Sequence, residues 1–187
     1  MDNIDSFLPE GDLSGIILMD CKWAVKTAGP SPYNNERTEL FFMGCKKALS
    51  GNPCKGCFNS QTWDSSKAMY SHDPVKMAEH INNCAPNKYI TIGGGEPFDQ
   101  KDNYLLIELC KAAHTIGKDV WVWSGYTFEE LKKDDKKLEL LQECDILVDG
   151  PFIDEQKDLS LKWRGSTNQR VINIKESLAS GKVVEYR

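Results

Sequence analysis

Short apolar runs alternate with amphipathic stretches along most of the chain. Five runs have the period-two or β-branched pattern that is typical of strands, and they fall at residues 15–20, 38–43, 88–93, 119–124 and 145–150. Apolar residues recur at helical spacing in three other stretches, at residues 73–84, 102–117 and 127–144, with a break in the last one at 133–135. This alternation predicts an α/β fold with parallel strands and crossover helices.

Chain length limits how such a sheet can close. With 187 residues the chain suits one domain, and we expect residues 1–187 to form it, with short N-terminal and C-terminal extensions. A complete eight-stranded barrel typically needs about 250 residues. If the strands curve as in a barrel, we therefore expect a partial, open parallel β/α barrel, whose open side could admit a bulky partner such as another protein.

Composition and charge exclude several classes of function. The 28 acidic and 23 basic residues give a net charge of −5, which disfavours a nucleic-acid binder. The acidic, polar N-terminal segment lacks the cationic region and the apolar run of a secretory signal, and no early apolar run approaches the roughly 20 residues that span a membrane. We therefore expect a cytoplasmic protein that binds neither nucleic acid nor membranes.

Three of the seven cysteines, Cys45, Cys54 and Cys57, lie within one short stretch. In a chain without an export signal thiols stay reduced, so metal or redox chemistry explains this grouping better than a disulfide framework. Cys45 follows a predicted strand, at the strand end where active sites of α/β barrels gather. Two glycines and a proline in the loop let its backbone bring the three thiols together.

Three kinds of site are compatible with these thiols. A Cys-x-x-Cys pair alone suits zinc, a dithiol redox couple or an iron–sulfur cluster. Structural zinc needs four ligands, and because His72 and His80 are not spaced as a zinc pair, the fourth ligand would have to be distant. A four-iron cluster on three thiolates leaves one iron open to a small molecule. Cysteine spacing alone does not choose among the three.

Several other residues of these types have structural interpretations. Trp121 and Trp123 alternate on a predicted buried strand and are expected in the core, whereas His114 is expected at the surface. The four isolated cysteines are interpreted as small buried hydrophobes, namely Cys21, Cys84, Cys110 and Cys144.

Five segments, in order, resemble the activating proteins of anaerobic (class III) ribonucleotide reductase, which are radical S-adenosylmethionine (SAM) enzymes. The resemblance covers roughly residues 29–172 and rests on GCKKALSGNPCKGCFNSQTW, ITIGGGEPFDQ, DVWVWSGYTFEEL, DILVDGPF and DLSLKWRGSTNQRVI. The chain differs from the family pattern Cys-x-x-x-Cys-x-x-Cys in having five more residues in the first gap. Lengthening a flexible loop costs only about 0.6 kcal/mol per doubling, so the same three thiolates can still converge.

The resemblance implies that Cys45, Cys54 and Cys57 hold a [4Fe-4S] cluster, with its unique iron chelated by the amino and carboxylate groups of SAM. One electron from a flavodoxin-like or ferredoxin-like donor would then cleave SAM. The 5′-deoxyadenosyl radical would take a hydrogen from a glycine Cα in the large subunit of the reductase. The implied function is that of a radical SAM activase with a radical SAM domain.

Residues expected to bind SAM lie in several places. The resemblance implies that GGGEP binds the methionine moiety, with Glu96 accepting from its ammonium group, and that the neighbours of Cys57 contact the adenosyl group. Ser124 and Asp149 end predicted strands and would face the same rim, where a cation could bridge Asp149 to the SAM carboxylate. A plain turn, a core aromatic or a turn cap are the other interpretations. The predicted SAM-binding residues are Gly56, Phe58, Gly94, Gly95, Glu96, Ser124 and Asp149.

Two questions stay open at this level. The segment WRGSTNQR, residues 163–170, either is an edge that shapes the mouth of the site or docks the partner, or is a hydrogen-bonded loop that closes the domain. The activase also has rivals. They are an activator of another glycyl radical enzyme, a small-molecule radical SAM enzyme, a non-catalytic zinc-binding module, and a dithiol oxidoreductase built around Cys54 and Cys57.

Overall fold

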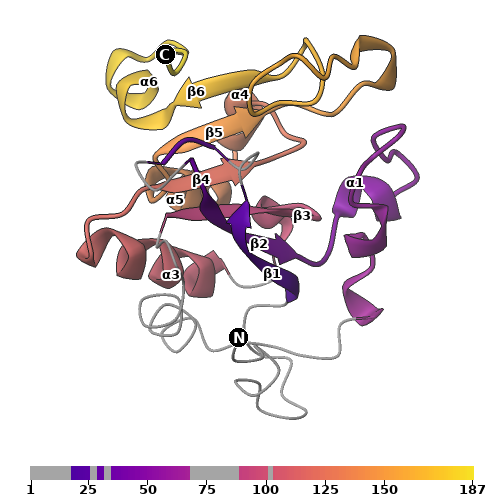
Figure 1. Ribbon diagram of the computed structural model, residues 1–187, viewed down its shortest axis with the longest axis horizontal. Coiled ribbons are helices and arrows are strands. Elements are labelled where there is room, and N and C mark those ends of the chain that lie inside the picture. Colours follow the sequence, from indigo (N-terminus) through magenta and orange to yellow (C-terminus); the bar gives the residue numbers. More distant parts are fainter. Residues whose placement is uncertain (1–17, 26–28, 32–34, 68–88, 101–102) are drawn as a thin grey trace.

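The computed structural model describes residues 18–25, 29–31, 35–67, 89–100 and 103–187, with only the backbone described for 18–25 (Figure 1). Three sequence predictions lie outside this description. They concern the helix at residues 73–84, Cys84 within it, and the side chain of Cys21.

Within the described residues, six strands form one sheet whose spatial order follows the order along the chain (Figure 1). They are β1 Leu18–Val25, β2 Arg37–Phe42, β3 Ile90–Gly94, β4 Val120–Trp123, β5 Ile146–Asp149 and β6 Arg170–Asn173. Strands β2 to β5 run parallel, whereas β1 and β6 lie antiparallel at the two edges. The predicted α/β fold with a mostly parallel sheet is confirmed.

The sequence pattern locates the inner strands better than the edges. Strands β2 to β5 coincide with predicted runs, but β1 shares only residues 18–20 with the run at 15–20. Strand β6, with the sequence RVIN, lies outside every predicted run. Its two apolar residues, Val171 and Ile172, are adjacent and flanked by polar residues, so neither a period-two pattern nor a longer apolar run marks this strand.

Helices connect the strands and lie mainly on one face of the sheet. Neighbouring parallel strands joined in chain order, with the usual right-handed crossovers, place their helices on the same face. In Figure 1, α3 and α5 lie together on one side of the sheet. None of the helices in the described part of the chain is both long and apolar enough to span a lipid bilayer. The helices are α1 Lys46–Leu49, α3 Asn103–Thr115, α4 Phe128–Leu131, α5 Asp135–Gln142 and α6 Ile174–Ser180, and the 3-10 turns are η2 Ser60–Thr62, η3 Ser65–Lys67, η4 Pro97–Asp99 and η5 Asp154–Gln156.

Local capping explains why the predicted helical stretch at 127–144 becomes two helices. Helix α4 begins with a capping box, in which the Thr127 side chain accepts from the Glu130 N–H and the Glu130 side chain accepts from the Thr127 N–H. Asp134 then starts α5 by accepting from two backbone N–H groups of its first turn. The predicted break at 133–135 is confirmed. Helix α3 confirms the predicted stretch at residues 102–117, whereas α6 was not predicted.

The two faces of the sheet carry different cores. Toward the helices, strand residues such as Leu40, Ile92 and Val122 are fully buried and pack with residues of α3, α4 and α5. On the other face, Trp121 and Val148 belong to a smaller cluster that is completed by partly buried aromatic residues. Each fully buried large apolar side chain stabilises the fold by about 1.5–3 kcal/mol, so the helix-side core supplies most of the apolar stabilisation.

Predictions for single residues mostly agree with burial. Trp121 is buried, and Cys110 and Cys144 are buried within the helix-side core, as predicted for structural residues. His114 is exposed at the end of α3, as expected. Trp123 is only partly buried, because its ring lies at the edge of the smaller cluster rather than within it.

A buried arginine closes the amino end of the parallel strands. Arg37, the first residue of β2, has no exposed surface, and each of its five guanidinium N–H groups has an acceptor. Its Nη1 lies 2.7 Å from Asp119 Oδ1, and its Nε lies 2.8 Å from Thr91 Oγ1. The other acceptors are backbone carbonyls of Pro30, Ile90 and Asp119. Burial lowers the pKa of Arg37, while the Asp119 carboxylate opposes this shift.

Candidate cofactor site

A cavity of about 720 Å³ lies at the carboxyl end of the parallel strands. Glu39, Phe41 and Gly93 line it and alternate along β2 and β3 with residues of the helix-side core, so the cavity is on the face away from the helices. Its rim consists of the segments that follow β2, β3, β4 and β5. Ligands of parallel α/β folds bind at this end of the strands.

Three named segments form the rim. The cysteine loop, residues 44–58, follows β2, and the GGGEP segment, residues 93–97, ends β3 and continues beyond it. The wall loop, residues 150–169, runs from β5 to β6. Of the residues predicted to bind the cluster or SAM, the cavity is lined by Cys45, Cys54, Cys57, Phe58, Gly94, Gly95, Glu96 and Ser124, but not by Gly56 or Asp149.

The three cysteines reach the cavity through a compact loop. Cys45 lies just before the single turn of α1, its backbone N–H donates to Trp63 O at 3.0 Å, and Cys57 N–H donates to Cys54 O at 3.2 Å. The residues that lengthen the first gap therefore form the α1 turn and its exit. All three thiols are free and half-buried. The longer gap does not prevent the three cysteines from lining one cavity.

The arrangement of the three thiols is compatible with a cluster. Among the described residues, no group of three or more His, Cys, Asp or Glu side chains is arranged to hold one metal ion. A cubane needs no such common point, because each cysteine binds a different iron. Burial raises the pKa of Cys45 and of Cys54, and backbone amides of Ala48 and Phe152 oppose this by hydrogen bonding to the sulfurs. Bound iron would supply the positive charge that holds these sulfurs as thiolates.

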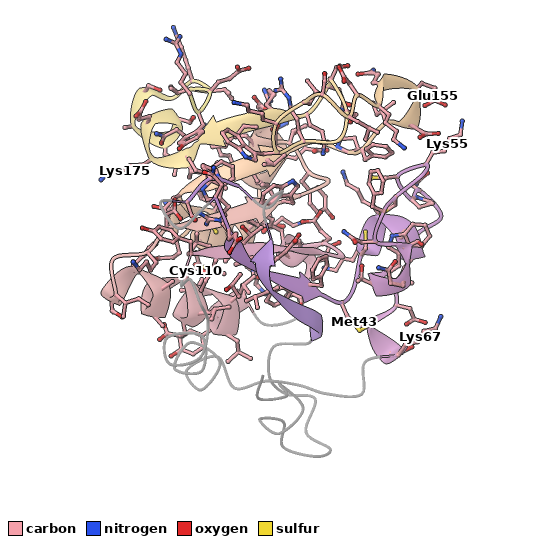
Figure 2. All side chains as sticks on the ribbon, in the orientation of Figure 1. Met43, Lys55, Lys67, Cys110, Glu155 and Lys175 are labelled. Carbon is pink, nitrogen blue, oxygen red and sulfur yellow. The ribbon has the colours of Figure 1, made fainter. Side chains whose placement is uncertain are left out.

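Contacts between the cysteine loop and the wall loop form a clasp across the cavity mouth. Lys55 Nζ lies 2.6 Å from Glu155 Oε1, and both side chains are exposed (Figure 2). The rings of Phe58 and Phe152 meet edge to face, with centroids 5.2 Å apart. Phe58 is 62% exposed, so it is not a core aromatic. Gly56 lies under this clasp, where an added Cβ would be 3.2 Å from the Asp154 carboxylate.

Gly94 and Gly95 are required by a close approach of two backbones. A Cβ on Gly94 would lie 2.6 Å from Phe42 N, and a Cβ on Gly95 would lie 2.4 Å from Gly44 O. The Glu96 N–H donates to the same Gly44 O at 2.7 Å. The glycines thus hold the start of the cysteine loop against β3. Their close approach to the methionine moiety of SAM stays a prediction.

Glu96 is a buried carboxylate on the cavity wall. It is 2% exposed and accepts from Phe98 N–H at 3.2 Å, from Ser124 Oγ at 2.8 Å and from Gly125 N–H at 2.7 Å. Burial raises the pKa of Glu96 to about 7, although these three donors oppose the shift. No Lys, Arg or His of the described residues forms an ion pair with it. A cationic group in the cavity would therefore favour the ionised form of Glu96.

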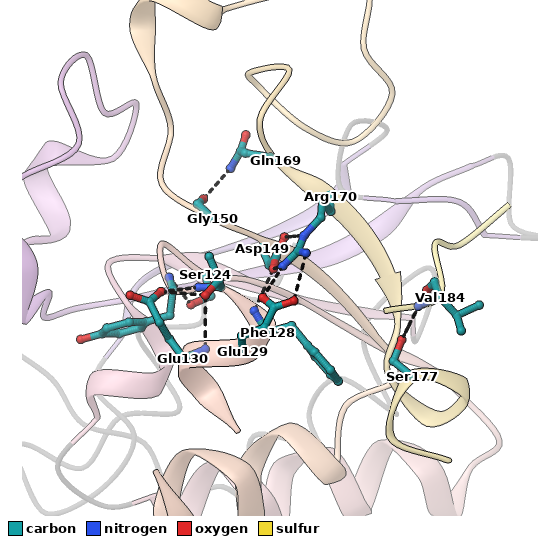
Figure 3. A network of polar contacts seen from close by, with 12 residues as sticks. Ser124, Phe128, Glu129, Glu130, Asp149, Gly150, Gln169, Arg170, Ser177 and Val184 are labelled. Atoms are coloured by element: carbon teal, nitrogen blue, oxygen red, sulfur yellow. Dashed lines mark hydrogen bonds and ion pairs between the residues drawn. The ribbon is translucent and has the colours of Figure 1, made fainter. Parts of the chain in front are cut away.

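Ser124 and Asp149 occupy different positions at the ends of their strands. Ser124 lines the cavity and orients Glu96. Asp149 is almost fully buried behind the wall, where its carboxylate caps α4 by accepting from Phe128 N–H at 2.8 Å and pairs with Arg170, whose Nε lies 3.0 Å from Asp149 Oδ1 (Figure 3). The structure thus gives Asp149 the capping role that the sequence left open, and contact with SAM stays a prediction.

The segment at residues 163–170 combines both of its interpretations. Gln169 closes it, accepting from Gly165 N–H at 2.9 Å and donating through Nε2 to Gly150 O at 3.1 Å. Trp163, Arg164, Gly165 and Gln169 also line the cavity. A hydrogen-bonded loop therefore forms one wall of the site. Docking of a partner on this wall stays a prediction.

Sequence reasoning missed two polar residues of the site. Lys47, in α1, lines the cavity and donates to Gly125 O at 2.6 Å. Asp99, in η4, accepts from Lys46 N–H at 2.7 Å and from Tyr126 Oη at 2.9 Å, and so fixes the α1 turn. The only sequence signal for Lys47 was its place in the lengthened gap. Asp99 follows GGGEP by two residues, but nothing in the pattern shows its long-range partners.

Comparison with known proteins agrees with this geometry. Residues 35–172 match the family described as a 4Fe-4S single cluster domain. The chain is 37% identical over 138 residues to the anaerobic ribonucleoside-triphosphate reductase-activating protein of Vibrio cholerae serotype O1. The aligned residues cover 71% of this chain and 84% of that protein. It belongs to the family of anaerobic ribonucleoside-triphosphate reductase-activating proteins.

Other members of the activating-protein family show similar coverage. The Haemophilus influenzae protein is 35% identical over 145 residues, covering 74% of this chain and 88% of its own length. The protein of Enterobacteria phage T4 is 33% identical over 144 residues, covering 72% and 82%. The resemblance seen in the sequence is confirmed, and the matched region includes the cysteine loop, the GGGEP segment and the wall loop.

Proposed function

We propose that this protein is a radical SAM activase that generates a glycyl radical on the large subunit of anaerobic ribonucleotide reductase. The observation that carries the proposal is that three free cysteines and the buried Glu96 line one cavity in a member of this family. Bound there, a [4Fe-4S] cluster would supply the electron that cleaves SAM to methionine and a 5′-deoxyadenosyl radical, which takes a hydrogen atom from a glycine Cα.

The residues of the cavity bind and orient rather than transfer protons. Cys45, Cys54 and Cys57 would hold the cluster, and the Glu96 carboxylate would accept from the SAM amino group. Phe58, at the mouth, offers an exposed ring for stacking with the adenine. The apolar walls exclude water from the reacting groups. Gly56 and Asp149 would act through the loops that they position.

The open side of the sheet fits a large protein substrate. We propose that the sheet is the partial β/α barrel of radical SAM enzymes and that residues 1–187 form one domain. The two edge strands of the described sheet, β1 and β6, do not pair with each other, so the barrel is open. The reductase loop would enter at the cavity mouth, and a flavodoxin-like or ferredoxin-like protein would supply the electron. The cytoplasm, where thiols stay reduced, is the proposed location.

Anaerobic reconstitution with iron and sulfide tests the proposal directly. We expect the protein to acquire a [4Fe-4S] cluster and, with SAM and a reductant, to form 5′-deoxyadenosine and methionine. Adding the reductase subunit should yield a glycyl radical signal by electron paramagnetic resonance. Cys54→Ala should abolish cluster and cleavage, whereas Cys110→Ala, which removes a thiol from the helix-side core away from the cavity, should keep both (Figure 2).

Each possible failure points to one of the rival functions. Full-rate cleavage in Cys54→Ala would contradict the assignment of the cysteine loop. One zinc per chain, without iron or sulfide in anaerobically prepared protein, would support the zinc-binding module instead. SAM cleavage without a radical on the reductase would indicate another glycyl radical enzyme or a small-molecule substrate.

A further inference from the structure

Two opposite charges flank Gly125 on the cavity wall without pairing with each other. Glu96 Oε2 accepts from Gly125 N–H at 2.7 Å, and Lys47 Nζ donates to Gly125 O at 2.6 Å. Within the described part of the chain, neither side chain forms an ion pair with any other group. The wall thus presents one buried anion and one partly buried cation, each held by the backbone of the same residue.

The space between these two charges is open because Gly125 has no side chain. A Cβ at this position would lie 3.5 Å from Glu96 Oε2 and 4.0 Å from Lys47 Cδ. A side chain at this position would therefore contact both Glu96 and Lys47. Bare backbone at this point lets a small ligand approach both.

Lys47 is held in place rather than free to swing. Its Nζ lies 4.3 Å from the centroid of the Tyr126 ring, and the Tyr126 hydroxyl donates to Asp99 Oδ1 at 2.9 Å. The other oxygen of Asp99 accepts from Lys46 N–H at 2.7 Å. One carboxylate therefore fixes both the turn that carries Lys47 and the ring beneath it. Since an ammonium has three N–H donors, Lys47 keeps donors for a ligand after binding Gly125 O.

We propose that Lys47 completes the subsite for the amino-acid end of SAM by donating to the SAM carboxylate, beside Glu96, which would accept from the SAM amino group. The inference rests on the proposed function and adds Lys47 to it. A carboxylate has two oxygens, so one can bind the open iron while the other accepts from Lys47. Because Lys47 lies in the lengthened part of the cysteine loop, the longer gap contributes a ligand contact.

Ligand binding to the reconstituted enzyme tests this subsite. The probes are SAM and decarboxylated SAM, which keeps the ammonium group and lacks the carboxylate, and the readout is the dissociation constant measured by calorimetry under anaerobic conditions. Lys47→Met should weaken SAM binding by about tenfold or more, the usual effect of losing a hydrogen bond to a charged group. The affinity for decarboxylated SAM should not change.

Two control variants separate the subsite from effects on the loop. Lys46→Met removes the same charge from the exposed neighbour in the same turn and should bind SAM like the wild type. Lys47→Arg keeps a donor and should retain most of the affinity. Iron and sulfide content, measured for every variant, reports whether the cluster is intact.

The outcomes distinguish this inference from the proposed function. If Lys47→Met binds SAM like the wild type, or loses affinity equally for SAM and decarboxylated SAM, the subsite is wrong and the activase proposal stands. If the wild-type protein carries its full cluster and binds neither probe, the proposed function itself is wrong.

Discussion

Each end of the parallel strands has a buried ionisable side chain, but within the described residues only the one at the amino end has an ion-pair partner. At the amino end, Arg37 uses every N–H donor and pairs with Asp119. At the carboxyl end, Glu96 accepts three hydrogen bonds from neutral donors and has no cationic partner among the described residues. A buried charge whose hydrogen bonds and ion pair are all made within the protein stabilises the fold. A buried charge that lacks an ion-pair partner and lies beside a cavity is suited to bind a ligand.

The strongest test of this comparison removes the amino-end charge. Arg37→Met should lower the free energy of unfolding by about 3–5 kcal/mol, because it leaves buried acceptors without donors and breaks a buried ion pair. Urea denaturation measures the loss. Asp119→Asn should cost less, since the Asp119 side chain is 39% exposed and Arg37 keeps its other acceptors. A loss below 1 kcal/mol for Arg37→Met would contradict the structural role given to this cluster.

The carboxyl-end charge should act through pH instead. The pKa of Glu96 is about 7 in the folded protein and 4.5 as a model value, so the folded state holds this proton more tightly than the unfolded state. The contribution of Glu96 to stability without cofactor should therefore be fully present below pH 4.5, fall as pH rises between 4.5 and 7, and be lost above 7. The predicted loss from this one group is about 3 kcal/mol.

Glu96→Gln isolates that contribution from those of other titrating groups. The free energy of unfolding, measured by urea at several pH values, should fall less steeply with pH in Glu96→Gln than in the wild type, because glutamine does not ionise. The same variant should bind SAM more weakly, since it no longer offers a carboxylate acceptor to the SAM amino group. Parallel pH profiles for the two proteins would show that Glu96 is not the buried charge described above.

The smallest effect on stability is expected from breaking the exposed ion pair between Lys55 and Glu155. Lys55 and Glu155 lie 2.6 Å apart, but their side chains are 76% and 64% exposed. Lys55→Ala should therefore leave the free energy of unfolding nearly unchanged. Thermal or urea unfolding checks this expectation. A loss as large as that of Arg37→Met would show that the clasp at the cavity mouth, not the buried cluster, holds the fold.

Local sequence patterns were sufficient to predict those helices and strands whose structure depends mainly on their own residues. The inner strands are short apolar, β-rich runs, and Asp134 ends one helix region and begins another through contacts within its own turn. Edge strand β6 lacked such a signal because only its two central residues are apolar. The grouping of Cys45, Cys54 and Cys57 was visible from their spacing and from the resemblance to a family.

Contacts between distant segments could not be predicted from the pattern. Lys47 meets Gly125 across 78 positions, and Asp149 meets Arg170 across 21. Nothing in the local sequence around Asp149 indicates that its carboxylate forms an ion pair with an arginine. The same limit applies to Gly94 and Gly95, whose need for a bare backbone comes from the strand and loop that pass beside them.

The joint between Gly95 and Gly44 has a consequence for engineering. Since the carbonyl of Gly44 receives the Glu96 N–H and leaves no room for a side chain on Gly95, the first residues of the cysteine loop are stitched to the neighbouring strand. Insertions at that point would separate β2 from β3, and changes within α1 would move Lys47. Grafted or randomised sequences should therefore be introduced at residues 50–53, which are exposed and lie between α1 and Cys54.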